Sequence, residues 1–336
     1  MFTQTTTTRN PADSMVSTWR HDRSQWNTYH WMIELLGLHL IDFDAEVPIF
    51  SKKDKIPAIR EWTVHLWILL HAAIPLAIHH AYTIYTGQNM HLIGAFALYS
   101  SAFKLNGIHE MHIMRRLGQV YGFLDGDKHP RDEIPDVGVG KVIRELISTS
   151  TLRMVMAIFL TYQPGRHRHH WNGSGFPWRS ACTVSRWTSG STGITTPPDE
   201  TSQSLAFCVR RPRAGIHGYY GYSASCVYHV EDYRLPMGFY GWWICFQYIA
   251  FSEFIGHSGL RLHGGAPSTV NWLLEIFDAE LVIEDHDLHH RYGWRKSHNY
   301  GKQTRLWDSI FGTCHERIES VKENVDYTNR VTMPLL

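Results

Sequence analysis

The sequence has little charge and few cysteines, and each shortage excludes a class of protein. Its 336 residues include five Cys, none in CxxC spacing, which excludes a disulfide framework and a zinc ribbon. The 32 Lys and Arg nearly balance the 31 Asp and Glu, so the formal charge of +1 provides no long-range field to recruit nucleic acid or an acidic partner. The N-terminal residues lack the basic-then-apolar pattern of a signal peptide, and no internal repeat is visible.

Apolar runs indicate a membrane protein. Charged residues make up 19% of the chain and aromatic residues 13%, which excludes a disordered protein. The run Thr63–Thr86 contains no Asp, Glu, Lys or Arg, and at ~1.5 Å per residue it can cross a hydrocarbon core of ~30 Å. A weaker apolar run covers residues 91–108 and a third begins near Leu152. A fourth, at residues 236–256, is strongly apolar and has Glu253 inside it. We therefore predict an all-α, integral membrane protein with two or three spans. The mean hydropathy of −0.26 favours the alternative, a soluble helical core.

Changes of composition divide the chain into four predicted regions. Residues 1–60 are polar, and residues 61–162 combine transmembrane helices with a polar connector placed at 109–145. Residues 163–234 are anomalous, because they are rich in Ser, Thr, Gly, Arg and Pro and show no period. An apolar, aromatic pattern returns in residues 235–336, which we predict to hold the last membrane span and a histidine-rich region.

Histidine is the abundant residue, with 23 copies, and imidazole is the commonest side-chain metal ligand. In the motif HDLHH, His286, His289 and His290 stand at i, i+3 and i+4, so a helix would place the three rings on one face. His257 and His263 lie upstream, just after the last apolar run. We expect the acidic neighbours to accept the second ring N–H and so fix each tautomer. These neighbours are Glu284, Asp285 and Asp287.

Other histidines give weaker signals. His109 and His112 are spaced as on a helix face, and His79 and His80 fall within the first apolar run. The run RHRHH at 166–170 resembles a ligand cluster, but its two Arg disfavour a metal cation. Imidazole binds Fe, Zn, Cu and Ni, so spacing alone does not select the metal.

The chain resembles the fatty acid hydroxylase/sterol desaturase superfamily, in particular its fungal members. The resemblance is carried by GHSGLRLH at 256–263, by the segment around HDLHH at 277–294, and by NYGKQTRLWDSIFGT at 299–313. Residues 235–252 and 115–142 also resemble the same group.

This resemblance implies an endoplasmic reticulum membrane fold with a histidine-rich cytosolic cap that holds a di-iron centre. It implies hydroxylation or desaturation of a lipid, a sterol or another apolar metabolite with O2, the electrons coming from NAD(P)H through cytochrome b5 or a reductase. Mapped onto this chain, the family's ligands are His257, His286, His289 and His290, with no catalytic residue beyond them. His263 matches no firm role.

The sequence departs from the family where its first two histidine boxes should fall, between residues 164 and 235. Segments there, such as TSGSTGIT at 188–195, can be back-translated in a shifted frame into text typical of the family. We interpret residues 163–234 as out-of-frame translation, the alternative being a genuine lineage-specific loop. Four mapped ligands suffice for one metal ion, so we expect this chain to bind iron weakly.

Two other functions stay open. A degenerate, catalytically impaired membrane protein would lack a complete di-iron site. A zinc hydrolase would need an HExxH motif, and the two HE pairs, at 109–110 and 315–316, lack the second His. The sequence does not distinguish sterols, sphingoid bases, fatty acyl chains and polycyclic metabolites as substrates.

Overall fold

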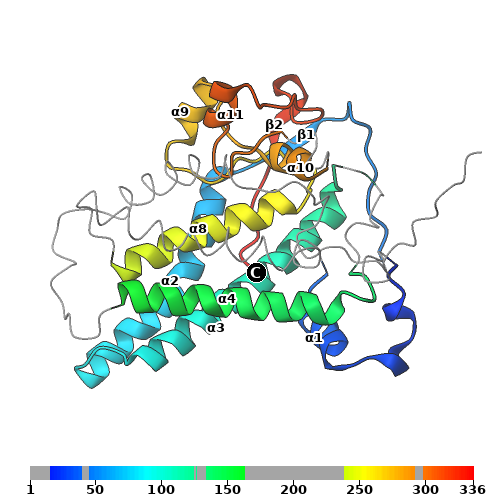
Figure 1. The fold of residues 1–336 in the computed structure, drawn as a ribbon. Coiled ribbons are helices and arrows are strands. Elements are labelled where there is room, and N and C mark those ends of the chain that lie inside the picture. The colour runs from blue at the N-terminus through cyan, green and yellow to red at the C-terminus, as the bar shows by residue number, and fades with distance from the viewer. Residues whose placement is uncertain (1–15, 40–44, 125, 127–133, 163–237, 292–297) are drawn as a thin grey trace, which may run out of the picture.

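The computed structural model of this chain describes residues 16–39, 45–124, 126, 134–162, 238–291 and 298–336 (Figure 1). These residues are mostly helical, as the sequence predicts. The α-helices are α1 Thr28–Leu36, α2 Glu61–Thr86, α3 Leu92–Tyr121, α4 Val139–Thr161, α8 Phe239–His257, α9 Asn271–Ile276, α10 Ile283–Arg291 and α11 Leu306–Phe311. The strands are β1 Ile56–Ile59 and β2 Val325–Val331, and three 3-10 turns are η2 Trp19–His21, η3 Arg23–Gln25 and η7 Lys322–Asn324.

Four long helices form the body of the molecule, and α8 packs against α2, α3 and α4 (Figure 1). Their shared core is aromatic. The Trp243 ring lies 5.0 Å from that of Tyr99, and its Nε1–H donates to the carbonyl of Ala72 at 3.0 Å. Burying large rings supplies much of the apolar area that holds the helices together, while this hydrogen bond satisfies the buried indole N–H.

Helix α2 is the candidate membrane span among the described residues, by length and composition. It begins after Arg60, whose carbonyl accepts the Thr63 hydroxyl at 2.7 Å, and it ends at Gly87, whose left-handed φ of 69° suits glycine. Only 33% of its most apolar window is buried, whereas the core helix of a soluble protein is mostly buried. Within the part of the chain that the structure describes, α2 alone is both long and apolar enough to cross a membrane, so a multi-pass arrangement stays a prediction.

The polar connector placed at 109–145 is wrong in its bounds. Residues up to Tyr121 belong to α3, and α4 begins at Val139. The reason is amphipathicity: Ile113, Met114 and Leu117 are buried on one face of α3, and the polar residues between them made the segment resemble a loop.

The all-α prediction missed two strands. β1 pairs with β2 in parallel, although Ile56 and its partner Val325 lie near opposite ends of the described chain. The backbone N–H of Met333 also donates to the Thr63 hydroxyl at 3.0 Å. The strands are short and form only through this long-range pairing, so no local pattern predicts them.

The predicted division into four regions is not tested by the structure. The anomalous segment 163–234 and the RHRHH run at 166–170 lie outside the described residues. The out-of-frame interpretation of that segment therefore stays a prediction.

Candidate metal centre

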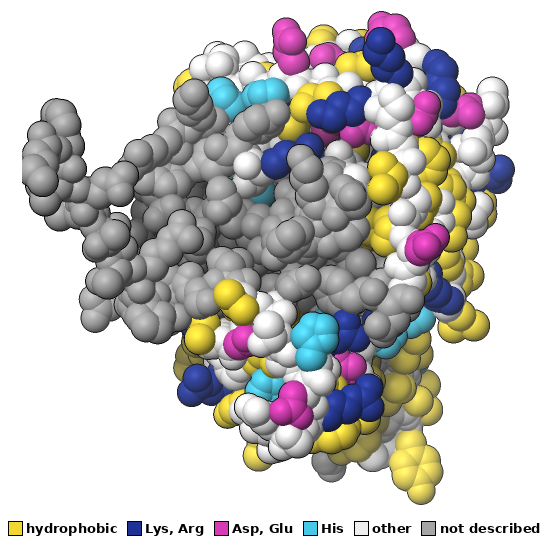
Figure 2. Space-filling model, turned by 90° about the vertical axis from the view of Figure 1, so that its right-hand side faces the viewer, with side chains coloured by type: hydrophobic (Ala, Val, Ile, Leu, Met, Phe, Trp, Pro, Cys, Tyr) yellow, Lys and Arg dark blue, Asp and Glu magenta, His cyan; other side chains and the backbone are white. Residues whose placement is uncertain are grey.

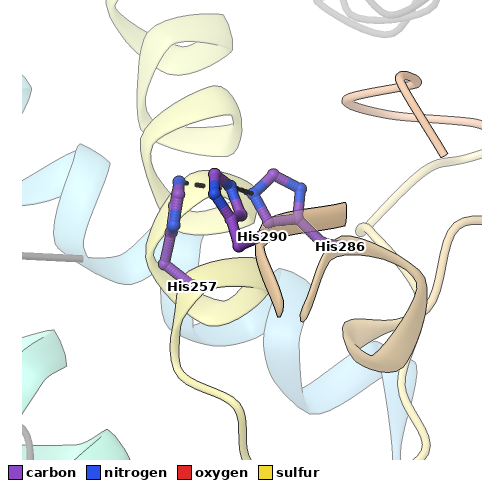
Figure 3. A group of neighbouring side chains, drawn as sticks. All are labelled: His257, His286 and His290. Atoms are coloured by element: carbon purple, nitrogen blue, oxygen red, sulfur yellow. Dashed lines mark hydrogen bonds between the residues drawn. The ribbon is translucent and has the colours of Figure 1, made fainter. Parts of the chain in front are cut away.

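The end of α8 and helix α10 bring three imidazoles together (Figure 3). The Nε2 atom of His286 lies 3.3 Å from that of His257 and 3.2 Å from that of His290. One ligand atom from each ring can be chosen so that all three lie within 4.8 Å of one another. His257 is the last residue of α8, and His286 and His290 are one turn apart on α10, as the HDLHH spacing predicts.

A glycine allows α8 to approach α10 this closely. A Cβ atom added to Gly256 would lie 3.0 Å from Cγ of His286 and 3.2 Å from its Cδ2. Any larger residue would push against the imidazole. The sequence GH at 256–257 thus supplies a ligand and, beside it, the space for another ligand.

Burial keeps the rings of His286 and His289 in the neutral form, which binds metal. It lowers the pKa of His286 well below its ordinary value, and the positive charge of Lys302 acts in the same direction. Burial, with a further contribution from Lys302, lowers the pKa of His289 to about 4. Both rings are therefore neutral near pH 7, and a neutral imidazole offers a free ring nitrogen to a metal ion.

His289 lies beside the group rather than within it. Its ring centroid is 5.0 Å from that of His290 and 6.3 Å from that of His286. Its Nδ1–H donates to the backbone carbonyl of His298 at 2.7 Å, which assigns the ring lone pair to Nε2.

Glu253 is a member of the site that the sequence analysis did not identify. It lies one turn before His257 on α8, with Oε2 3.6 Å from His257 Nε2 and 3.8 Å from Lys302 Nζ. The i, i+4 spacing of Glu253 and His257 was the available signal. We had noted this residue only as a charge inside an apolar run.

The structure shows a different role for the acidic residues around HDLHH. Glu284 accepts backbone N–H groups of residues 318–320 at 2.6–3.1 Å, and Asp285 pairs with Arg317 at 2.8 Å. Asp287 pairs with Arg291 one turn later. These carboxylates hold α10 in place, whereas we had predicted that they orient the rings.

The remaining histidine candidates lie elsewhere in the fold. His263 lies beside β1, where its backbone N–H donates to the carbonyl of Pro57 at 2.9 Å. Its ring centroid lies 6.0 Å from that of Tyr327. His79 is buried in α2 and bonds Tyr99 and Asn89, at 3.0 and 2.9 Å.

His109 and His112 lie on α3, as expected for a helix face. Their Nε2 atoms lie 3.2 Å from the carbonyl oxygen of Leu335 and 2.8 Å from that of Leu36, respectively.

The donor set fits iron. Three imidazoles on two packed helices are suitable ligands for one first-row transition-metal ion. Within the described ranges no other group of three His, Cys, Asp or Glu side chains brings its ligand atoms as close together, so these residues offer a site for one ion.

Comparison with known proteins extends the similarity beyond this motif. Fatty acid hydroxylase vlmA from Lecanicillium sp. is 33% identical to this chain over 324 residues, covering 86% of this chain and 87% of the relative. No family model matches the chain. No solved structure matches it either.

Proposed function

Because the chain belongs to the fatty acid hydroxylase family, we propose that it is a membrane-bound non-haem iron oxygenase that hydroxylates an apolar substrate. The imidazole group of His257, His286 and His290 is the observation that carries this proposal. The alternative, a degenerate chain without an assembled centre, is not favoured by a similarity that covers 86% of the sequence.

We assign one iron to His257, His286 and His290, with His289 as the neighbouring ligand. The second iron of a di-iron pair would need ligands beyond these four histidines. When bound, the irons supply O2-activating redox chemistry, with electrons delivered from NAD(P)H through cytochrome b5 or a reductase.

The protein's own residues prepare this site. Burial keeps His286 neutral, and the His298 carbonyl retains the proton on Nδ1 of His289. Glu253 lies between His257 and Lys302, where its negative charge offsets that of the lysine. His286 is only 2% exposed, so little bulk water reaches its ring.

We place the enzyme in a membrane, the endoplasmic reticulum being the expected one. The exposed apolar side chains of α2 support this placement. Figure 2 shows hydrophobic side chains running down the right-hand edge of the molecule. Such a location would deliver a fatty acyl chain or a similar apolar molecule from the bilayer.

The test is incorporation of ¹⁸O from ¹⁸O2 into a panel of fatty acyl, sphingoid and sterol substrates. The full chain would be reconstituted in phosphatidylcholine vesicles with cytochrome b5 and its reductase, and its iron content measured. We expect slow formation of a labelled product and weakly bound iron, both lost in His286→Ala and both retained in His21→Ala, which changes an exposed ring in η2. Equal turnover by the two variants would overturn the proposal.

A further inference from the structure

Two short helices carry large apolar side chains that the rest of the described chain leaves uncovered. On α9 these are Trp272 (64% exposed), Leu273, Ile276 and Phe277 just beyond its end, the last two 68% exposed. On α11 they are Leu306, Ile310 and Phe311, the last 72% exposed. Soluble monomers rarely expose a contiguous apolar patch of this kind without a partner.

Each helix is anchored by its opposite face, so the exposed face has a fixed direction. Asn271 of α9 is buried, and its side chain packs on Gly265, where an added Cβ atom would lie 3.3 Å from Asn271 Oδ1. Asp308 of α11 is buried and accepts the backbone N–H groups of Tyr300 and Gly301, both at 2.8 Å. The apolar positions 272, 273, 276 and 277 follow one side of a helix, as do 306 and 310.

The two helices form one surface. The N–H of Arg305, just before α11, donates to the carbonyl of Ala279, just after α9, at 2.8 Å. Glu280 and Thr304 form a β-bridge beside it. Figure 1 shows α9 and α11 side by side at one end of the molecule.

This surface is connected to the start of the candidate span. Ile59 lies two residues before α2, and its backbone N–H donates to the carbonyl of His263 at 2.8 Å. Three residues after His263, the N–H of Ala266 donates to the carbonyl of Leu281 at 2.8 Å. The Glu280–Thr304 bridge completes the series of contacts. These contacts link α11 to the segment that leads into α2.

The apolar exposure also continues onto α2 itself. Trp62 at its second position is 62% exposed, and Leu66, Leu69, Leu70 and Ile74 follow it along the helix. Burial, with the nearby Glu61 carboxylate, raises the pKa of Glu275, which agrees with α9 lying beside the start of α2. Trp and other aromatic residues concentrate where a protein meets the membrane–water interface.

We propose that α9 and α11 lie in the interfacial layer of the bilayer that α2 crosses, with Trp272, Phe277 and Phe311 inserted among the lipids. The bilayer is the favoured occupant because the surface continues the lipid-facing side of α2, which a protein partner would have to share with lipid. A consequence is that the imidazole group lies close to the membrane surface, because two of its rings belong to α10, which follows shortly after α9. The inference rests on the membrane location in the proposed function.

Lipid photo-crosslinking tests it without altering the chain. The full protein would be reconstituted in phosphatidylcholine vesicles containing a diazirine-labelled acyl chain, irradiated and mapped by mass spectrometry. We expect adducts on peptides 272–277 and 306–311 as well as on α2, and none on the exposed turn η7. The variant carrying Trp272→Ser, Phe277→Ser and Phe311→Ser should lose the adducts on α9 and α11 and keep those on α2.

The possible results separate the two proposals. Adducts on α2 alone would refute the interfacial placement and leave the membrane location standing. Absence of adducts from α2 as well would refute the membrane location. Crosslinks from α9 or α11 to a second copy of the chain, without lipid adducts there, would show that a protein interface covers this surface.

Discussion

The Nδ1 atom of His289 lies 2.7 Å from the backbone carbonyl oxygen of His298, the residue before a left-handed asparagine. That asparagine, Asn299, has φ of 52° and is 1% exposed. Its Nδ2–H donates to the Asp285 carbonyl at 3.0 Å, and its Oδ1 accepts the His315 N–H at 2.8 Å. Asn299 therefore fixes the position of the carbonyl that selects the tautomer of His289.

Replacing Asn299 should weaken metal binding. Asn299→Gly keeps the left-handed backbone but loses both side-chain bonds, whereas Asn299→Asp keeps the acceptor for His315 and loses the donor to Asp285. We expect both to lower metal affinity by roughly 10-fold or more, the glycine variant more strongly, as for other outer-shell partners of a ligand. Cobalt(II) titration followed by absorption spectroscopy measures this, and unchanged affinity in both variants would contradict it.

Gly256→Ala should lower metal affinity while leaving the free energy of unfolding little changed. Alanine favours a helix over glycine by about 1 kcal/mol, which offsets the strain of the new contact and leaves the free energy of unfolding little changed. The added Cβ, 3.0 Å from His286 Cγ, should displace that ring and lower metal affinity. Gly107→Ala in α3 is the matched control, because its Cβ would meet Phe254 at an ordinary 3.4 Å. Equal metal affinities in the two variants would contradict the steric argument.

Arg317→Met should strongly destabilise the fold. Arg317 bonds Asp285 and Glu280, both at 2.8 Å, and the Arg317–Asp285 pair is 7% and 0% exposed. Removing the cation takes this partner from Glu280 and leaves Asp285 with the longer contact to Arg305 at 3.5 Å, which costs about 3–5 kcal/mol. Lys322→Met breaks the Asp278 pair, 64% and 60% exposed, and should cost at most about 1 kcal/mol. Urea unfolding in detergent compares the two, and similar losses would show that burial does not decide the effect.

The protein should lose stability as the pH falls from 6.5 towards 4. Burial, aided by the charge of Arg317, lowers the pKa of His263 from 6.5 to about 4. Between these values the unfolded chain binds the proton and the folded chain does not, so this contribution is complete above pH 6.5 and is lost progressively as the pH falls to about 4. It amounts to roughly 3 kcal/mol.

His263→Leu should flatten this part of the pH dependence, and His21→Leu, at an exposed position, should not. Urea midpoints measured on metal-free protein at pH 7 and pH 4.5 would show the difference. An unchanged pH dependence in His263→Leu would mean that other groups determine the acid lability.

The sequence predicted the elements whose signals are local. The spacing of HDLHH is helical by itself, and α10 presents His286 and His290 as that spacing requires. The apolar run at 236–256 likewise became α8, which places His257 at its end. Both elements depend on residues that lie within a few turns of one another.

Long-range partners could not be predicted. Glu284 and Asp285 resembled ring acceptors because they adjoin the ligands in sequence, but their partners lie more than 30 residues later. His263 also adjoins the motif, yet pairing with Pro57 draws it into the strand region. A single sequence does not show which distant segment will compete for such a side chain.

The pairing of β1 with β2 bears on when the protein can finish folding during synthesis. The Thr63–Met333 contact joins residues 270 positions apart, so at ~5–20 residues per second the ribosome needs roughly 15–50 s to supply the second partner. During that interval the start of α2 lacks its final support. A messenger that ends early, before codon 325, would yield a chain that keeps every described imidazole ligand and still leaves this junction unsecured.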